Sequence, residues 1–244
     1  MDHSEEIANM ENITKEKQHI GGLFDRIARH YDGLNHLLSL GIDRCWRRQA
    51  VGSMQKADHV LDVAVGTGDL ALLMLRRGKA QRVTGIDLST EMMRIGAEKA
   101  KRAGREIRFM EANAQKMPFE DASFDAVTCA YGVRNFADLD AGLSEMYRVL
   151  RPGGELTILE FGYPQQKMVR WAYDWYFTTW LPMIGRLLSR DKTAYTYLNQ
   201  SVRHFCYADD FLHHLKKVGF QGTYYRPQTF GISYLYKAQK LAEK

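Results

Sequence analysis

A glycine-rich stretch, with one acid before it and another at the end of the next apolar run, is the most informative part of the sequence. The stretch reads Val60-Leu61-Asp62-Val63-Ala64-Val65-Gly66-Thr67-Gly68-Asp69-Leu70-Ala71. Gly66 and Gly68 let the backbone turn tightly and approach a ligand closely, because neither has a side chain. Asp87 ends the next apolar run, and its two oxygens can accept hydrogen bonds from both hydroxyls of a ribose. The pattern predicts a nucleoside-binding site.

The glycines alone do not choose between two cofactors, because the same pattern with Asp87 also fits the fingerprint of an NAD-binding fold. Asp62, however, lies inside the predicted strand, where its carboxylate can reach the cationic amino group of a methionine moiety and would repel a pyrophosphate. Asn113 ends a later strand, where its amide can hydrogen-bond an adenine edge. The chain also ends in a predicted strand pair and not in a second nucleotide-binding half. Together these features favour S-adenosylmethionine.

Alternating strand and helix patterns position these residues. Strand patterns occupy residues 59–65, 82–87, 106–111, 124–131 and 154–161, and helical patterns occupy 69–78, 89–103 and 138–150. Such alternation predicts right-handed crossovers and a mostly parallel, Rossmann-like sheet covered on both faces. A turn at 152–154, a helix at 208–218 and strands at 220–226 and 231–238, joined around Pro227, complete the pattern. The fold class is α/β, with an N-terminal helical extension and a C-terminal antiparallel strand pair.

We expect one domain preceded by a tail. Residues 1–18 are polar and charged, and we expect a disordered or frayed segment there. The domain spans residues 19–244, divided into an N-terminal helical segment (19–56), a cofactor-binding core (57–161), a helical lid (164–205) and a C-terminal helix with the strand pair (206–240).

The composition excludes several classes of protein. Of the 244 residues, 45% are hydrophobic and 26% are charged, as in an ordinary globular domain. The net charge of +5 suits an anionic cofactor or an acidic lipid surface as well as a plain solvated surface, and we expect no nucleic-acid partner. The three scattered cysteines indicate neither a disulfide framework nor a zinc site, and no metal is expected. The acidic start differs from a signal peptide, and no run is apolar enough for a membrane span, so we expect a cytoplasmic protein.

Beyond these motifs, the sequence resembles the ubiquinone/menaquinone biosynthesis C-methyltransferases from about Leu23 to Lys240. The matching stretches are Phe24-Asp25-Arg26-Ile27-Ala28-Arg29-His30-Tyr31-Asp32, Asn113-Ala114 with Pro118-Phe119, Tyr131-Gly132-Val133-Arg134-Asn135, Glu145-Met146-Tyr147-Arg148-Val149-Leu150-Arg151-Pro152-Gly153-Gly154 and Thr229-Phe230-Gly231-Ile232. The resemblance implies a class I methyltransferase fold and C-methylation of a prenylated hydroquinone, either the naphthoquinol demethylmenaquinol or the benzoquinol of ubiquinone synthesis.

The resemblance also implies site residues. Cofactor contacts fall on Thr67, Asp87, Asn113 and Ala114, and active-site roles fall on Tyr31, Arg134 and Asn135. Three places depart from the family pattern: Val65 stands where a small residue is usual, Ala130-Tyr131 replaces a Ser-Phe pair, and His204-Phe205-Cys206-Tyr207 replaces a turn that contains proline. These departures concern fine substrate contacts and not the class of reaction.

Methylation at a ring carbon requires an ionised quinol, because the carbon beside a phenolate oxygen is nucleophilic. A phenol-type hydroxyl has a pKa of about 10, so the site must stabilise the phenolate. Arg134 is the expected cation, with a water beside it as the base, while Asn135 and Tyr31 orient the quinol oxygens. Arg134 could instead form a surface salt bridge with Asp138 or Asp140. Three histidines are alternative bases, namely His30, His36 and His204.

The aromatic segment from Trp171 to Trp180 is either core or a lid over an apolar prenyl tail. As a lid flanked by Arg170 and Arg186 it would also suit contact with the inner face of the cell membrane. A homodimer is compatible with the sequence. Three alternatives to quinol methylation stay open: a methyltransferase with another small or lipid acceptor, an NAD(P)-dependent oxidoreductase, and a non-catalytic quinone or lipid carrier.

Overall fold

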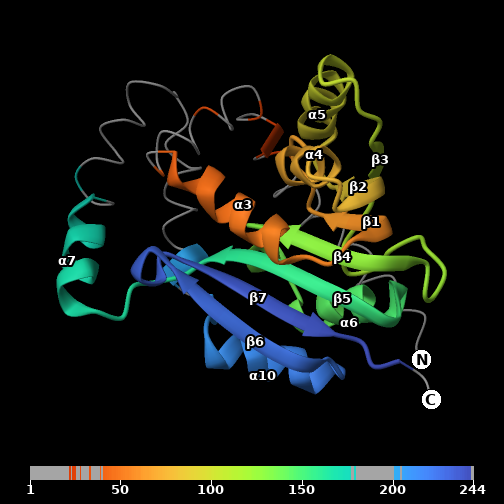
Figure 1. Cartoon of the computed structure of the whole chain (residues 1–244). Helices are drawn as coiled ribbons and strands as arrows, with labels where there is room; N and C mark the ends of the chain where they lie inside the picture. The colour runs from red at the N-terminus through yellow and green to blue at the C-terminus, as the bar shows by residue number, and fades with distance from the viewer. Residues whose placement is uncertain are drawn as a thin grey trace, which may run out of the picture.

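A single seven-stranded sheet forms the centre of the molecule in a computed structural model, which describes residues 22, 24, 25, 28, 33, 39, 41–176, 179, 201–203 and 205–242 (Figure 1). The strands are β1 (Ala57–Val63), β2 (Ala80–Asp87), β3 (Arg108–Glu111), β4 (Phe124–Ala130), β5 (Leu150–Phe161), β6 (Gln221–Gln228) and β7 (Ser233–Gln239). Their order is β3-β2-β1-β4-β5-β7-β6; β1 to β5 are parallel, and β7 is antiparallel to both of its neighbours. The predicted fold class is confirmed.

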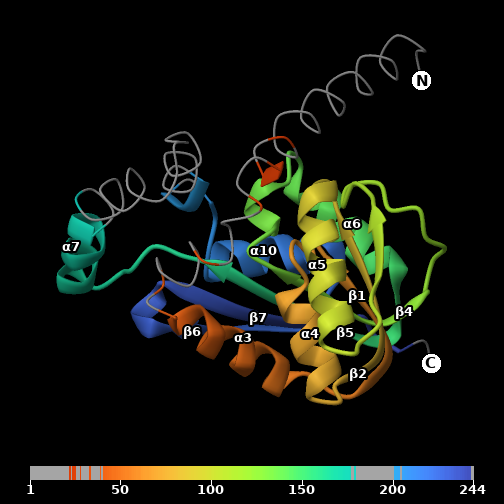
Figure 2. The same ribbon diagram turned by 90° about the horizontal axis from the view of Figure 1, so that it is seen from above.

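Helices cover both faces of the sheet (Figures 1 and 2). They are α3 (Ile42–Ser53), α4 (Asp69–Arg76), α5 (Thr90–Arg102), α6 (Leu139–Val149), α7 (Lys167–Trp175) and α10 (Asp209–Val218). Apolar residues of α3, α4 and α5 pack on one face of β1 and β2, and those of α6 and α10 pack on the other. Each predicted core helix lies within two residues of its observed bounds, because the apolar residues recur with the helical period.

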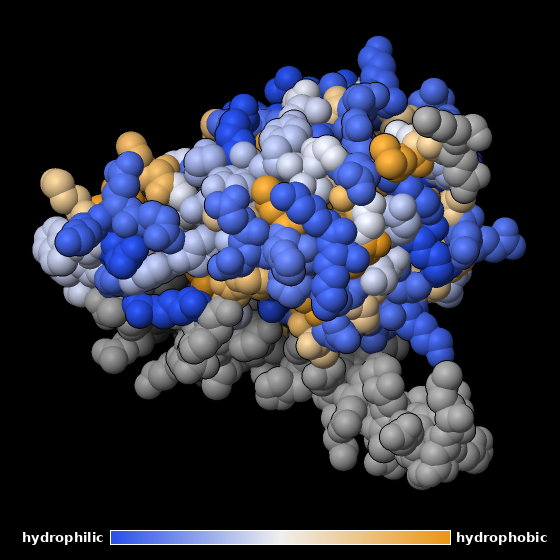
Figure 3. Space-filling view, turned by 90° about the horizontal axis from the view of Figure 1, so that it is seen from below, coloured by the Kyte–Doolittle hydropathy of each residue, from blue (hydrophilic) through white to orange (hydrophobic). Residues whose placement is uncertain are grey.

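The surface over α10 and α6 is largely hydrophilic, as the view from below shows (Figure 3). Its small orange areas are interrupted by hydrophilic side chains, as expected for helices that bury one face and expose the other. None of the helices in the described ranges is long and apolar enough to cross a membrane.

Two predicted turns are strands instead. Residues 152–154 lie inside β5, where the register to β4 shifts between Phe124 and Ala126, so they form an irregularity of the strand and not a turn before it. The positive φ of Gly153 (80°) accommodates this irregularity. Pro227 lies inside β6, and the chain reverses at Thr229–Gly231. Proline is tolerated there because β6 is an edge strand.

Candidate active site

The parallel strands bring the predicted site residues to one edge of the sheet. The ends of β3, β2, β1, β4 and β5 follow one another in that order, and each is followed by a loop that carries predicted or newly found site residues. In an open α/β sheet, ligands bind outside the carboxyl ends of the strands. The loop after β1, with its glycines, therefore lies between the ends of β2 and β4, where a nucleoside and an acceptor can meet.

Asp87, at the end of β2, holds the glycine loop in place. Its Oδ2 accepts a hydrogen bond from the backbone N–H of Gly66 (2.8 Å), and its Oδ1 accepts one from the N–H of Ser89 (2.9 Å). Desolvation raises the pKa of this carboxyl, and the two N–H groups oppose that shift. Each carboxylate oxygen keeps a further lone pair, so two ribose hydroxyls can still donate to it.

Asp25 reaches this place from the N-terminal segment. Its Oδ1 accepts hydrogen bonds from the hydroxyl of Ser89 (2.5 Å) and from the N–H of Glu91 (3.2 Å), so it caps the start of α5 beside Asp87. No local pattern could predict this contact, because Asp25 and Ser89 are 64 positions apart.

Asp62 provides the test of whether S-adenosylmethionine fits the site. Its side chain is buried in β1; Oδ1 accepts a hydrogen bond from the hydroxyl of Thr128 (2.7 Å), and Oδ2 has no hydrogen-bond partner in the described part of the chain. Burial raises its pKa to about 7. A buried carboxylate oxygen without a partner is costly unless a cation meets it. The α-amino group of the cofactor is such a cation, so the residues present fit the cofactor.

Glycines on the neighbouring strand and loop make room for two residues of the loop after β1. Val65 fills space that Gly85 leaves open, since a Cβ at Gly85 would lie within 2.9 Å of three side-chain atoms of Val65. Ala64 has a positive φ of 54°, and its methyl group faces Gly132, where a Cβ would approach it to 2.5 Å. The larger residues of this loop are therefore matched by glycines on β2 and after β4.

Two stacked rings lie at the ends of β4 and β5. Tyr131 and Phe161 have ring centroids 4.3 Å apart at an interplanar angle of 24°. The guanidinium of Arg47, from α3, lies 5.3 Å from the centre of the Tyr131 ring, and that of Arg134 lies 5.2 Å from the centre of the Phe161 ring. The two stacked rings therefore lie with one guanidinium over each ring, and the Tyr131 ring is buried.

Arg134 is an ion-pair partner of Glu160 and not of Asp138 or Asp140. Its Nη1 donates to Glu160 Oε1 (2.6 Å) and to the carbonyl of Tyr131 (2.5 Å), and its side chain is 4% exposed while that of Glu160 is fully buried. The Arg134 N–H also donates to Glu160 Oε2 (3.3 Å). The guanidinium is therefore held between the residue that follows β4 and the end of β5.

The two acids that were alternative partners of Arg134 are used elsewhere. Asp138 accepts from the N–H of Ala141 at the start of α6, and Asp140 pairs with His214 and Lys217 of α10. The alternative of a surface salt bridge to either acid is thus wrong, and Arg134 pairs instead with the buried acid at the end of β5.

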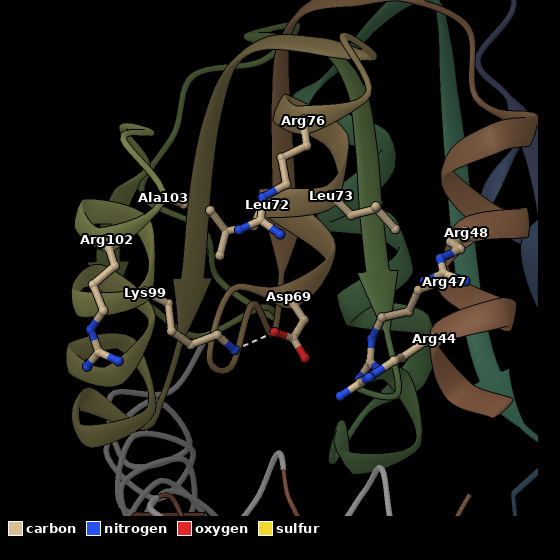
Figure 4. Close-up of a pocket in the computed structure, with 10 residues that line it drawn as sticks. All are labelled: Arg44, Arg47, Arg48, Asp69, Leu72, Leu73, Arg76, Lys99, Arg102 and Ala103. Atoms are coloured by element: carbon tan, nitrogen blue, oxygen red, sulfur yellow. Dashed lines mark hydrogen bonds and ion pairs between the residues drawn. The ribbon is translucent and has the colours of Figure 1, made fainter. Parts of the chain in front are cut away.

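A basic hollow of about 420 Å³ opens between α3, α4 and α5 (Figure 4). It is lined by Arg44, Arg47, Arg48, Asp69, Leu72, Leu73, Arg76, Lys99, Arg102 and Ala103. In Figure 4 the side chains of Arg44 and Arg47 extend toward Asp69, the first residue of α4. Arg47 forms a buried ion pair with Asp43, and its positive charge opposes the rise that burial causes in the pKa of Asp62. The sequence predicted only a helical segment over residues 19–56 here, because helical spacing does not say which face packs on the sheet.

The remaining predicted residues differ in their surroundings. Thr67 is buried, and its hydroxyl accepts a hydrogen bond from Lys99 Nζ (3.1 Å). Asn113 and Ala114 follow β3 half-buried, and Asn113 Oδ1 accepts from the N–H of Gln115 (2.9 Å). Asn135 ends the short helix after β4 and is half-buried. Four predicted residues lie outside the described residues, namely Tyr31, His30, His36 and His204.

No three histidine, cysteine, aspartate or glutamate side chains gather as a metal site within the residues that the structure describes.

Solved structures with low sequence identity share this fold. The cyclase SpnF covers 93% of this chain and 97% of its own at 18% identity, with a TM-score of 0.70. Phosphoethanolamine N-methyltransferase 2 of Haemonchus contortus, solved with S-adenosyl-L-methionine, covers 79% of this chain and 51% of its own at 18% identity, with a TM-score of 0.59. A cyclase and a methyltransferase on one fold mean that the fold alone does not fix the reaction.

Sequence relatives are much closer. The chain is 42% identical over 240 residues to the demethylmenaquinone methyltransferase of Bacteroides fragilis, covering 97% of this chain and 98% of that protein. It is 44% identical over 237 residues to the ubiquinone/menaquinone biosynthesis C-methyltransferase of Geotalea daltonii, and the match covers 95% of this chain and 100% of that protein. The model of the ubiE/COQ5 methyltransferase family matches residues 11–240. The chain therefore belongs to the ubiE/COQ5 methyltransferase family, and S-adenosylmethionine is its methyl donor.

Proposed function

We propose that this chain transfers a methyl group from S-adenosylmethionine to a ring carbon of a prenylated naphthoquinol and so converts demethylmenaquinol to menaquinol. The observation that carries the proposal is the identity of 41% and 42%, over nearly the whole chain, with two proteins named demethylmenaquinone methyltransferase. A benzoquinol is the second candidate, because the Geotalea daltonii relative is named for both quinones.

The cofactor supplies a methyl group that its positive sulfur already activates. Asp87 would accept hydrogen bonds from the ribose hydroxyls, and the free oxygen of Asp62 would bind the α-amino group. Arg47, which lines the basic hollow and forms an ion pair with Asp43, would bind the carboxylate of the same methionine moiety. Asn113 and the backbone of Ala114 would contact the adenine.

On the acceptor side, Arg134 would hold the quinol oxygen as it loses its proton to a water molecule. The cation stabilises the phenolate and so lowers the pKa of the quinol, which makes the neighbouring ring carbon nucleophilic. Glu160 would position the guanidinium, since both of its oxygens already accept hydrogen bonds from Arg134. Asn135 and Tyr31 would orient the quinol oxygens. Loss of the ring proton after methylation restores the aromatic ring.

The test is transfer of labelled methyl from S-adenosylmethionine to a short-chain demethylmenaquinone, with and without a reductant. Label on the naphthoquinone ring only under reducing conditions is the expected result, because only the quinol can ionise to a nucleophile. A short-chain demethylated benzoquinone, assayed in parallel, should give a lower kcat/KM. A preference for the benzoquinol would favour the second candidate. Binding of S-adenosylmethionine without transfer to either quinol would refute the acceptor and leave the fold and cofactor intact.

Binding of the cofactor should depend on pH through Asp62. Its pKa is raised to about 7, chiefly by burial, so the neutral acid predominates below pH 7 and cannot attract an ammonium group. The affinity for S-adenosylhomocysteine, which carries the same amino group, should therefore fall about fivefold between pH 7 and pH 6, because the ionised fraction of Asp62 falls by that factor. Isothermal titration calorimetry from about pH 5.5 to about pH 8 measures the dissociation constant of S-adenosylhomocysteine at each pH.

Asp62→Asn is the matched control for this pH dependence. The amide is isosteric with the acid but does not titrate, so the variant should bind weakly and with the same affinity across the range. A wild-type affinity that does not change with pH would show that Asp62 does not meet the amino group.

A further inference from the structure

Helix α7 carries large apolar side chains on its outward face. Met168, Trp171 and Trp175 are 85%, 71% and 51% exposed, and their spacing of three and four residues places them on one side of the helix. Exposed apolar residues usually occur singly, so three such side chains on one face of a nine-residue helix indicate a surface that binds something.

The inner face of α7 is fixed to the body of the protein. Tyr173 is buried and meets the ring of Tyr163 edge to face, with the centroids 5.8 Å apart. Asp174 accepts hydrogen bonds from the hydroxyl of Tyr163 (2.7 Å) and from Arg203 (2.7 Å). The outward side chains are therefore presented by a helix held in one orientation.

The charges on α7 favour an anionic partner. Lys167 is exposed at the start of the helix, and Arg170 follows in its first turn, with its guanidinium on the carbonyls of Pro164 and Gln165. The one acid of the helix, Asp174, is held by Tyr163 and Arg203 and so does not oppose them. Tryptophan, methionine and basic residues together suit the boundary between the headgroups and the acyl chains of a bilayer.

The position of α7 links this face to the acceptor site. Five residues separate the start of the helix from the end of β5 at Phe161, next to Glu160. Figures 1 and 2 both place α7 beyond the side of the sheet toward which β4 and β5 point, which is the side of the cofactor and acceptor residues. A ligand that leaves the bilayer at α7 therefore has a short path to Arg134.

We propose that α7 docks the enzyme on an anionic lipid bilayer, with Met168, Trp171 and Trp175 inserted among the acyl chains and Lys167 and Arg170 at the headgroups. This surface rests on the proposed function, because a prenylated quinol is dissolved in the bilayer. Docking there lets the ring reach Arg134 while the prenyl tail stays in lipid.

The test is cosedimentation with two kinds of vesicle. Neutral vesicles contain phosphatidylcholine alone, and anionic vesicles contain phosphatidylcholine with about 30% phosphatidylglycerol. The variant replaces two side chains, Met168→Ser with Trp171→Ser, and the matched control replaces two exposed side chains away from α7, Tyr224→Ser with Leu241→Ser (54% and 63% exposed). We expect the wild type and the control to bind the anionic vesicles, and the α7 variant to bind at least about tenfold more weakly. Blue-shifted tryptophan emission on anionic vesicles, lost in the α7 variant, reports insertion directly.

Two activity measurements separate this proposal from the proposed function. With a short-chain quinol in solution, the α7 variant should keep the wild-type rate, whereas with a long-chain quinol in vesicles its rate should fall about tenfold or more. Loss of both rates would mean that α7 acts on the active site and not on the membrane. Absence of methyl transfer in every protein would refute the acceptor but leave the vesicle result standing.

Three other results would overturn the inference. Equal binding of the α7 variant and the wild type to anionic vesicles would remove α7 as the docking element. Equal binding of the wild type to neutral and anionic vesicles would remove the role of charge. A wild-type dimer that the α7 variant dissociates, measured by light scattering, would show that the face joins two copies of the chain.

Discussion

Replacing Arg134 with methionine is expected to lower kcat for methyl transfer by about 100- to 1,000-fold while the dissociation constant of S-adenosylmethionine stays unchanged. The cation is the group that would stabilise the phenolate, and methionine keeps an unbranched, apolar side chain without the guanidinium and its charge. Because Arg134 would act by lowering the pKa of the quinol, the variant should recover part of its rate as the pH rises toward 10. Single-turnover rates from pH 6.5 to 9.5 and calorimetric binding measure both effects.

The same substitution leaves Glu160 buried without its cation, which is expected to reduce the free energy of unfolding by about 3–5 kcal/mol. A second substitution, Glu160→Gln, separates folding from catalysis. The double variant Arg134→Met with Glu160→Gln should regain most of the stability, measured by urea unfolding, and none of the rate. A near-normal rate in either variant that lacks Arg134 would show that the pair is structural and that the phenolate is held elsewhere.

The strand ends of the cofactor site could be predicted from the sequence because each is a local pattern. Asp62, Asp87 and Asn113 lie in or directly after apolar runs that form parallel strands, and parallel strands end at one edge. The topology itself followed from the alternation of strand and helix. For these residues, a local signal and a general rule of sheet geometry were sufficient.

The partners of Arg134 could not be predicted in the same way. Glu160 follows an apolar run just as Asp87 does, and that signal could have placed it in the site. Its pairing with Arg134 joins residues 26 positions apart, while Asp138 and Asp140 are nearer in sequence and are used by α6 and α10. Proximity in sequence indicated the wrong partners for Arg134. The pairing of β4 with β5 decides which charged side chains lie close together.

The turn predictions failed for a related reason. Proline and glycine at 152–154 and at Pro227 are typical of turns, but β5 and β6 accommodate them as an irregularity and as an edge-strand proline. A local pattern does not report whether a neighbouring strand needs the N–H group that proline lacks. Whether that N–H group is needed depends on how β5 and β6 pair with β7 in the folded sheet.

Replacing Asp87 with alanine is expected to weaken binding of S-adenosylmethionine by at least about 100-fold. Two hydrogen bonds from ribose hydroxyls to a charged acceptor would be lost, each worth about 1.5–3 kcal/mol, and 1.4 kcal/mol corresponds to a factor of ten. The glycine loop would also lose the acceptor for the N–H of Gly66. Asp58→Ala, which removes an exposed acid at the start of β1 near the opposite edge of the sheet, is the matched control and should bind normally.

Two fragments distinguish the contribution of Asp87 from that of Asp62. The ribose is present in both S-adenosylhomocysteine and 5′-methylthioadenosine, whereas the amino group is present only in the former. Asp87→Ala should therefore weaken both ligands by a similar factor, and Asp62→Asn should weaken only S-adenosylhomocysteine, each measured by calorimetry at pH 8. Unchanged affinity of Asp87→Ala for 5′-methylthioadenosine would mean that the ribose lies elsewhere, and the placement of the whole cofactor along the ends of β1 to β3 would then have to be given up.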